Sequence, residues 1–531
     1  MKLFLILFLI SIYSNLILSQ DDSKISAGVE LPDFVITGKE VVRIKKSDKL
    51  TPFLIGTFSE KFVLPTYSPE EIQVKEISLP IKDDLNLLSG GKFYKGYISG
   101  GIGLFALPDL SMLYAIPMSN AIFRTKINGA YNRSHIENSD NYKLQGNVDL
   151  IYWADVSSTF LPGTQFNLNS DLSTKGYKFY GSDISTQKRT LNNFKLTGSI
   201  KNEYNSSFLF KIVANNNYTS LINEKFTENT LDLSLSSLVR FSILNLGVHG
   251  KFKKVWLSDE LPSRSQKNYV LVRPSAGFQF TTLLKSAFGF TFSQSGEEKF
   301  LMPYGEIAIK LAPNFTLLGE FNPTAEFHSP ADFIIQNPYF LANNSQNLFI
   351  KKQLNYQVAV KYEYKNNLEI NGGFRYFSSD SLPYFYENQK GKFLLKFSDI
   401  KRLSPFIEFN LFNSTFGHFF SSLEFNAATN DTGQTFPYIP FYNLSAHYGY
   451  TFMEVLTTSL SFIYKGKFYT NLENSKQIDN YIDLSLSLAY KFDERFEFFV
   501  NFSNFINNKN FIWNNYQEKP FDILLGVKYN L

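Results

Sequence analysis

The sequence predicts an all-β membrane protein: a transmembrane antiparallel β-barrel of about 22 strands, within a range of roughly 18 to 22, behind an extended N-terminal arm. Three observations predict this fold class. Apolar and polar residues alternate in segments long enough to cross a bilayer, aromatic residues stand near the segment ends, and the alternation continues to the last residue of the chain.

The alternation is clearest in residues 444–452, 482–490 and 231–236, where every second residue is apolar and its neighbours are polar or small. A period of two places one set on each face of a sheet. A soluble β-sandwich would show the same period. The segment length of about 9–11 residues favours the membrane barrel, as do the aromatic ends at 93–97 and 496–499. The polar face, rich in Asn, Ser and Lys, suits a wet lumen.

Composition excludes several kinds of protein. The 531 residues contain no cysteine, which rules out disulfides, thiolate metal sites and cysteine nucleophiles. The 52 basic and 48 acidic residues give a net charge of +4, too balanced to indicate a nucleic-acid partner. The five histidines are far apart, so we expect no metal site and no cofactor. His328-Ser329 and His418 are the nearest approach to a catalytic group, but no oriented base accompanies them. We expect no catalytic residues and no enzyme.

The chain divides into three parts. Residues 1–20 have one early cation at Lys2 and a short apolar core, which is typical of a secretory signal peptide. Residues 21–91 contain five prolines and separated clusters of basic and acidic residues, so we expect an extended periplasmic arm or a reduced plug. Residues 92–531 carry the repeated strand pattern of the barrel.

Connections in the barrel region alternate in length, as in outer-membrane barrels. Tight breaks are expected at Pro313-Asn314, Lys365–Asn367, Met453-Glu454 and Asp493–Arg495. Longer loops are expected at 258–267, 328–347, 378–390 and 504–520. The roughly 440 residues divided by about 20 per strand and connection give about 22 strands.

The final segment is apolar at each odd position and ends the chain in register with the membrane face. It resembles the C-terminal signal strand that the barrel-insertion machinery recognises, although the last residue of such strands is usually Phe. The residues of this predicted signal are Phe521, Ile523, Leu525, Val527, Tyr529 and Leu531.

The closing segments also resemble those of TonB-dependent outer-membrane receptors. The aromatic strand from Phe496, the turn at Ser503–Phe505, the Pro520 step and the last strand follow the family's order. Pro437–Pro440 is similar to the family's mid-barrel entry, and Asn337–Leu341 is similar to its loop before a leucine-led strand. The resemblance covers about 310–531 by motif and 92–531 by architecture.

The front of the chain departs from that family. Residues 21–91 are too few for the family's plug and lack its Gly-rich motifs. One stretch is similar to the box through which such receptors bind TonB, and an extended run of this kind can add a strand to a partner's sheet edge. Its residues are Leu31, Pro32, Asp33, Phe34, Val35, Ile36, Thr37 and Gly38.

The resemblance implies solute uptake, or a porin-like channel, across the outer membrane of a Gram-negative bacterium. The implied partners are outer-membrane lipid, the insertion machinery and TonB or another periplasmic protein. A non-transporting surface-binding or scaffold barrel, whose arm recruits a periplasmic partner, remains the alternative. The loop sequences do not identify the transported solute.

Overall fold

The computed structural model describes residues 95–531 except 160, 203–206, 242, 259–267, 280, 282, 343–347, 366 and 414–415. The predicted signal peptide, the arm 21–91 and the TonB-box-like stretch Leu31–Gly38 lie outside the described residues. The boundary at residue 92 therefore stays a prediction. Among the described residues, no helix is long and apolar enough to cross a membrane.

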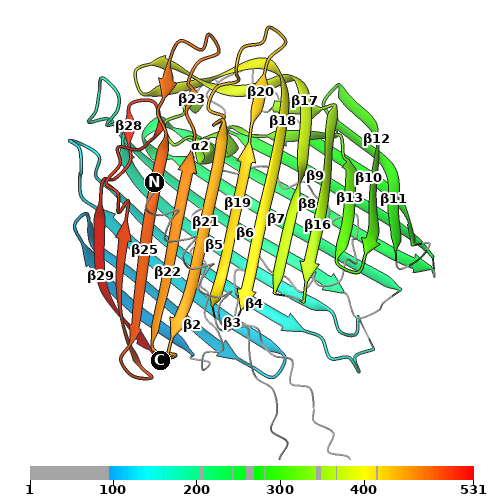
Figure 1. The fold of residues 1–531 in the computed structure, drawn as a ribbon, viewed down its shortest axis with the longest axis horizontal. Helices are drawn as coiled ribbons and strands as arrows, with labels where there is room; N and C mark the ends of the chain where they lie inside the picture. The colour runs from blue at the N-terminus through cyan, green and yellow to red at the C-terminus, as the bar shows by residue number, and fades with distance from the viewer. Residues whose placement is uncertain are drawn as a thin grey trace, which may run out of the picture. The chain divides into compact units, whose positions relative to one another are not determined.

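The described chain forms one large antiparallel sheet that closes on itself (Figure 1). Of its 23 strands, the short β20 (Ala427–Thr429) continues the pairing of β19 along β18, which leaves a wall of 22. The predicted all-β barrel of about 22 strands is confirmed. Each wall strand pairs with its neighbours in sequence order; they are β1 Gly96–Gly103, β2 Ala106–Pro117, β3 Ala121–Asn132, β4 Asn141–Trp153, β5 Gln165–Lys178, β6 Lys188–Asn202, β7 Phe208–Leu221, β8 Phe226–Phe241, β9 Leu244–Leu257, β10 Asn268–Gln279, β11 Leu284–Ser295, β12 Glu298–Ala312, β13 Phe315–Phe321, β16 Leu354–Tyr364, β17 Leu368–Gln389, β18 Lys392–Asn413, β19 Gly417–Phe425, β21 Tyr442–Phe452, β22 Leu456–Lys465, β25 Tyr481–Lys491, β26 Phe496–Ser503 and β29 Asp522–Asn530.

Pairing between the first and last strands closes the barrel. β29 lies between β26 and β1, with Tyr97 opposite Asn530 and Gly103 opposite Leu524. The amide of Leu531 donates to the carbonyl of Gly96 over 2.8 Å. A closed ring leaves no unpaired strand edge, which is the condition for a sheet to stand in lipid.

The two rims of the barrel differ. The predicted tight breaks after β12, β16, β21 and β25 all fall on the rim where β1 begins and β29 ends (Figure 1). The long connections 322–353, 426–441, 466–480 and 504–521 fall on the other rim and hold most of the remaining elements. These are η2 Ile222–Glu224, β14 Thr324–His328, α2 Pro330–Gln336, β15 Leu348–Lys352, β23 Phe468–Tyr469, β24 Gln477–Ile478, β27 Phe511–Trp513 and β28 Tyr516–Gln517.

The predicted loop at Ser378–Lys390 is wrong. β17 continues to Gln389 and pairs with β18 almost to the turn at Lys390-Gly391. A register shift between Ser379 and Leu382 accommodates the polar stretch before Pro383. The Ser-Asp-Ser and Pro residues thus mark a bulge within a long hairpin, because a bulge releases the ladder locally without ending the strand.

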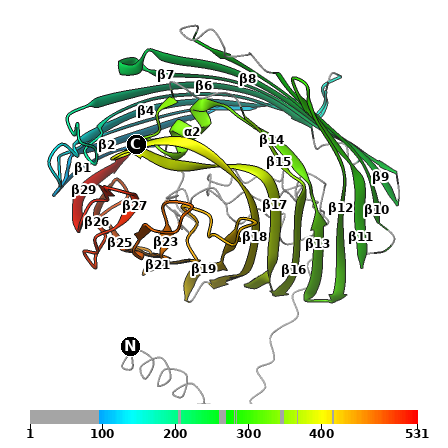
Figure 2. The same ribbon diagram turned by 90° about the horizontal axis from the view of Figure 1, so that it is seen from above.

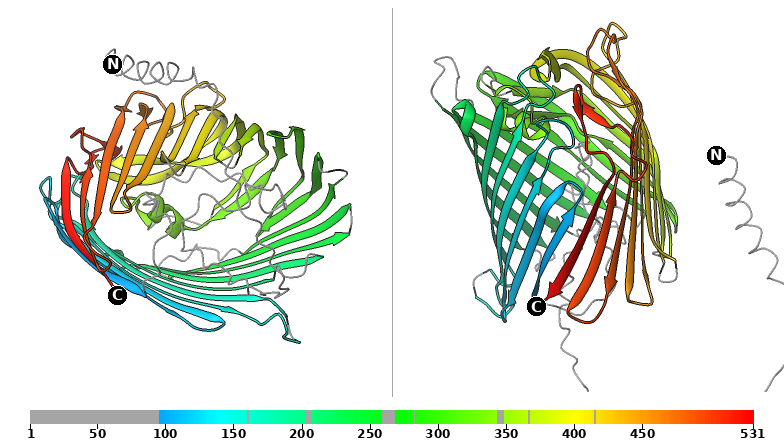
Figure 3. Two further views of the ribbon diagram at one scale, coloured as in Figure 1. Left: turned by 60° about the horizontal axis from the view of Figure 1, so that its bottom comes forward. Right: turned by 90° about the vertical axis from the view of Figure 1, so that its left-hand side faces the viewer.

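The long-loop rim folds inward. Seen from above, α2, β14 and β15 lie inside the ring of wall strands (Figure 2). The view from below shows the same insertion within the barrel (Figure 3, left). Residues 322–342 and 348–353, the described parts of this inserted connection, narrow the lumen from the loop side.

Candidate functional site

The inner face of the wall is polar, as the alternation predicts. On β5, Leu168 and Leu172 point outward and are 50% and 55% exposed, whereas Asn169 and Asp171 belong to the opposite face. Hydrogen bonds link inner polar groups between strands, such as Asn147 Nδ2 to Asp171 Oδ1 at 2.7 Å. The outer face can therefore contact lipid, while the inner face forms a hydrophilic lumen.

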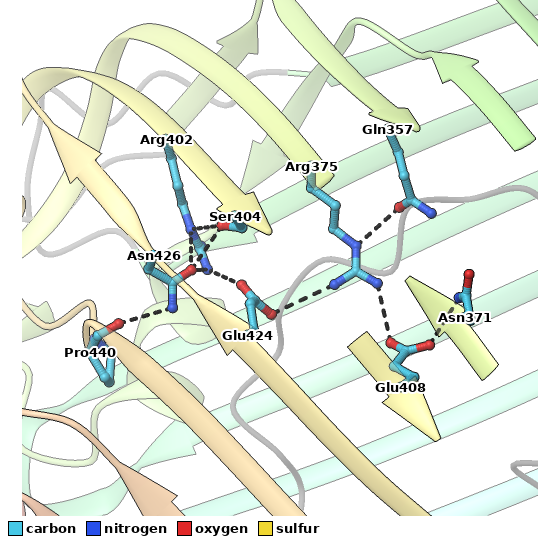
Figure 4. A network of polar contacts seen from close by, with 9 residues as sticks. All are labelled: Gln357, Asn371, Arg375, Arg402, Ser404, Glu408, Glu424, Asn426 and Pro440. Carbon is cyan, nitrogen blue, oxygen red and sulfur yellow. Dashed lines mark hydrogen bonds and ion pairs between the residues drawn. The ribbon is translucent and has the colours of Figure 1, made fainter. Parts of the chain in front are cut away.

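An ion-pair network crosses the lumen face of β16–β19 (Figure 4). Arg402 donates through Nη2 to Glu424 Oε1 at 2.9 Å and to Asn426 Oδ1 at 2.6 Å. Arg375 donates to Glu408 Oε1 at 3.3 Å, and its Nη1 lies 3.6 Å from Glu424 Oε2. Two arginines and two glutamates balance one another, so the charges of this network cancel.

The inserted connection is fastened to the inner wall by β9 and β10. Tyr269 stacks on Phe327 of β14, with centroids 5.8 Å apart, and donates its hydroxyl to the carbonyl of Ala325 at 2.7 Å. Lys253 Nζ lies 3.0 Å from Asp332 Oδ2 on α2. Burial alone would raise the pKa of Asp332, but Lys253 and then His328 lower it overall, so this carboxylate stays ionised. The insertion is thus held by a charged contact as well as by apolar packing.

Aromatic side chains from three connections on the loop rim meet and form a cluster that we call the aromatic cap. Tyr339, which follows α2, stacks on Tyr516 of β28 with centroids 3.4 Å apart and planes 10° apart. Tyr180 meets the edge of Tyr516 at 5.0 Å. Burial raises the pKa of the Tyr339 and Tyr516 phenols, so both stay neutral. The buried members of the surrounding core are Leu191, Leu221, Phe226, Phe333, Ile334, Phe340, Ala342, Phe385, Phe393, Trp513 and Tyr516.

Arg189 at the top of β6 anchors the cap. Its side chain is fully buried. Nη1 donates to the carbonyls of Pro338 at 2.5 Å and Phe340 at 2.8 Å, and Nε donates to Glu224 Oε1 at 2.5 Å. The ion pair with Glu224 and the two carbonyl contacts offset much of the free-energy cost of burying this guanidinium. Arg189 therefore ties the wall to the segment that carries Tyr339.

The 504–520 connection closes the cap from the other side. Asn514 and Asn515 each donate to Glu387 over 2.6 Å. The Tyr516 hydroxyl donates to the carbonyl of Gly391 at 2.6 Å. The carbonyl of Gln517 accepts from Tyr180 at 2.8 Å and contacts His135 Nε2 at 2.9 Å. Contacts with residues distant in sequence thus hold this loop in the aromatic cap.

The sequence-predicted site residues have separate outcomes. The predicted insertion signal from Phe521 to Leu531 spans β29, and Leu525, Val527 and Leu531 are exposed on its outer side. Its recognition by an insertion machinery stays a prediction. His328 contacts Glu326 at 3.2 Å, Ser329 caps α2, and His418 contacts Asn410 at 2.8 Å. In the described part of the chain, no three His, Asp or Glu residues are grouped to hold a metal.

Sequence reasoning missed the aromatic cap. The cap cannot be read from any one loop, because Tyr180, Tyr339 and Tyr516 come from three different connections. The available signal was the aromatic content of the long loops on one rim, which predicts that some of them pack together.

No protein-family model matches the sequence, and no curated protein sequence matches it either. Solved structures do match. The siderophore receptor PirA from Acinetobacter baumannii has a TM-score of 0.61 at 11% identity, covering 82% of this chain and 80% of that one. A mutant of the ferric enterobactin receptor PfeA from Pseudomonas aeruginosa has a TM-score of 0.60 at 10% identity, covering 82% and 80%.

This barrel has the fold of the TonB-dependent siderophore receptors. FpvA of P. aeruginosa, solved with bound pyoverdines, extends the match with a TM-score of 0.60 at 12% identity over 84% of this chain and 75% of that one. At such identities the likeness concerns the fold. The receptor fold accounts for the 22-strand wall.

Proposed function

We propose that this protein is an outer-membrane barrel of receptor type that takes up a solute through a lumen gated at the loop rim. The observation that carries the proposal is the aromatic cap, in which separate loops on one rim of a hydrophilic 22-strand barrel contact one another. A cap held by stacking and hydrogen bonds can open without disturbing the wall, because the wall strands pair independently of it.

The proposal gives residues 21–91 the role of a reduced plug or coupling arm. The stretch Leu31–Gly38 would pair with TonB or another periplasmic protein as an added strand. The predicted signal peptide would export the chain, and the alternation of β29 would serve the insertion machinery. The fold shared with PirA, PfeA and FpvA supports an uptake role, and a receptor of this kind needs no catalytic group.

Planar-bilayer conductance tests the proposal with four preparations of the mature protein: intact, lacking residues 21–91, carrying Tyr339→Ala with Tyr516→Ala, and carrying both changes. We expect no measurable conductance from the intact protein. We expect large conductance from the preparation that both lacks residues 21–91 and carries the two substitutions in the aromatic cap. Large conductance from the intact protein would instead identify an open pore. Silence from all four would contradict transport and favour the scaffold alternative.

A further inference from the structure

Two lysines face each other on the inner wall just below the aromatic cap. Lys143 of β4 is directly opposite Lys175 of β5 in the antiparallel register. The even-numbered Leu144 of β4 and Leu172 of β5 are exposed on the outer face. Because successive residues of a strand point to opposite faces, the odd-numbered lysines point into the lumen. Like charges opposite each other on neighbouring strands are destabilising. This pair therefore weakens the wall unless an anion lies between the two ammonium groups.

The next inward-facing pair toward the opposite rim adds two uncharged donors. Gln145 is opposite Ser173 in the same register. Strands lie about 5 Å apart, and alternate residues on one strand lie about 7 Å apart. The two pairs thus form a compact rectangle of four side chains, the donor rectangle, made up of Lys143, Lys175, Gln145 and Ser173. No hydrogen bond or ion pair within the described chain engages any of these four side chains.

Some charged side chains on the inner wall have partners of opposite charge. Arg124, on the inward face of β3, pairs with Asp149 at 2.7 Å. The arginines and glutamates on β17–β19 also neutralise one another. The lysines of the donor rectangle lack such a partner and are both well exposed to the lumen.

We propose that the donor rectangle binds an oxyanion group, such as phosphate, sulfate or carboxylate. Two ammonium groups can make charge-assisted hydrogen bonds to separate oxygens, while the amide of Gln145 and the hydroxyl of Ser173 can donate to the same group. Such a ligand relieves the lysine repulsion as it binds.

The position links the donor rectangle to uptake. Tyr177, two residues beyond Lys175 on the same face, donates its hydroxyl to the carbonyl of Pro338 at 2.8 Å beneath the cap. A solute that passes an opened cap meets the two lysines next. Assigning the oxyanion to a transported solute rests on the proposed function, whereas the binding site itself does not. The solute class would then be an anionic one.

Equilibrium binding of inorganic pyrophosphate to the detergent-purified mature protein tests this at low ionic strength, by calorimetry. Lys143→Gln with Lys175→Gln should weaken binding by more than about tenfold, since two charge-assisted contacts are lost. Lys299→Gln with Lys365→Gln removes the same charge away from the donor rectangle and should leave affinity within about twofold. Lys143→Arg with Lys175→Arg should retain binding.

Equal affinity in the first two double variants, or no binding with or without residues 21–91, would overturn the site. Binding that appears only after residues 21–91 are removed, and still needs both lysines, would show that the chain's own arm supplies the anion and would overturn the assignment to a solute. Because this assay requires no transport, a barrel silent in every conductance preparation would remove the proposed function and leave the site intact.

Discussion

Tyr339 and Tyr516 stack with ring centroids 3.4 Å apart, although 177 positions separate them along the chain (516 − 339). One belongs to the inserted connection between β13 and β16, and the other to the last long loop before β29. Their contact joins two loops that also contact the same end of the β17–β18 hairpin, one through Phe393 and the other through Glu387 and Gly391. It is the point at which the aromatic cap can part.

Replacement of Tyr516 by Ala should release the 504–520 connection and leave the barrel assembled. The ring is only 2% exposed, and truncation of a buried aromatic side chain costs about 3–5 kcal/mol. Amide hydrogen exchange across 505–520 should then become fast, while exchange in β25, β26 and β29 stays slow. Tyr516→Phe, which loses only the hydrogen bond to Gly391, should cost about 1 kcal/mol. Unchanged protection in Tyr516→Ala would show that the stack does not hold the cap.

The sequence could predict the wall because the alternation of each strand is a local property imposed by lipid on one side and water on the other. Residues 444–452 and 482–490 are predicted as strands from their own alternation, without knowledge of the strands that they pair with. The tight turns at Pro313-Asn314 and Met453-Glu454 were equally local. The long hairpin of β17 and β18 cannot be predicted from local sequence. A bulge near Ser379 and a loop would contain the same polar residues, and they differ only in whether the strands remain paired beyond them.

The sites depend on register and loop packing, which a single sequence does not contain. Lys143 and Lys175 become a pair only when β4 and β5 are aligned to the residue. A shift by one position would send one of them to the lipid face. Tyr339 and Tyr516 meet only because Arg189 and Glu387 draw their loops over the same mouth. The alternation therefore predicted the lumen but not the groups that meet within it.

The register of β25 predicts opposite effects for two adjacent residues. Leu486 faces outward beside Leu460, which is 40% exposed. Ser487 faces inward and donates to Asn501 Oδ1 at 2.6 Å. Leu486→Arg should cost about 2–4 kcal/mol and prevent assembly in lipid vesicles, whereas Ser487→Arg places its charge in the lumen and should assemble. Heat-modified migration of the folded barrel measures both. Equal assembly of the two variants would contradict the register.

Acid should loosen the cap through His135, which lies in the β3–β4 connection. Burial lowers the pKa of His135; the carbonyl of Gln517 opposes this shift and the nearby Lys519 adds to it. The released loop would titrate near 6.5, so the open state binds the proton more readily than the docked state. Docking is therefore fully stable above about pH 6.5 and weakens as the pH falls through that value toward the lowered pKa of the docked state.

Fluorescence of Trp513, with Trp153 and Trp256 replaced by Phe, reports on this release between pH 7.5 and 5. We expect a change in the intact cap and a flat profile in His135→Gln, which cannot gain a proton in that range. Because Tyr180 and Lys519 also face His135, a profile that persists in His135→Gln would assign the acid response to another group.

The Arg402–Glu424 pair permits a test of how the lumen network stabilises the wall. Both side chains are about 10% exposed, so Arg402→Met leaves Glu424 with only the longer contact to Arg375 and should cost about 3–5 kcal/mol. Removing both charges in Arg402→Met with Glu424→Leu should cost less than the single change, because no buried charge is then left short of partners. Lys401→Met, whose ion pair with Asp431 is about 60% exposed, should leave the unfolding midpoint close to that of the parent protein, because solvent screens this pair. Urea unfolding in detergent measures all three. A double variant less stable than Arg402→Met would mean that Glu424 stabilises the wall through groups other than Arg402.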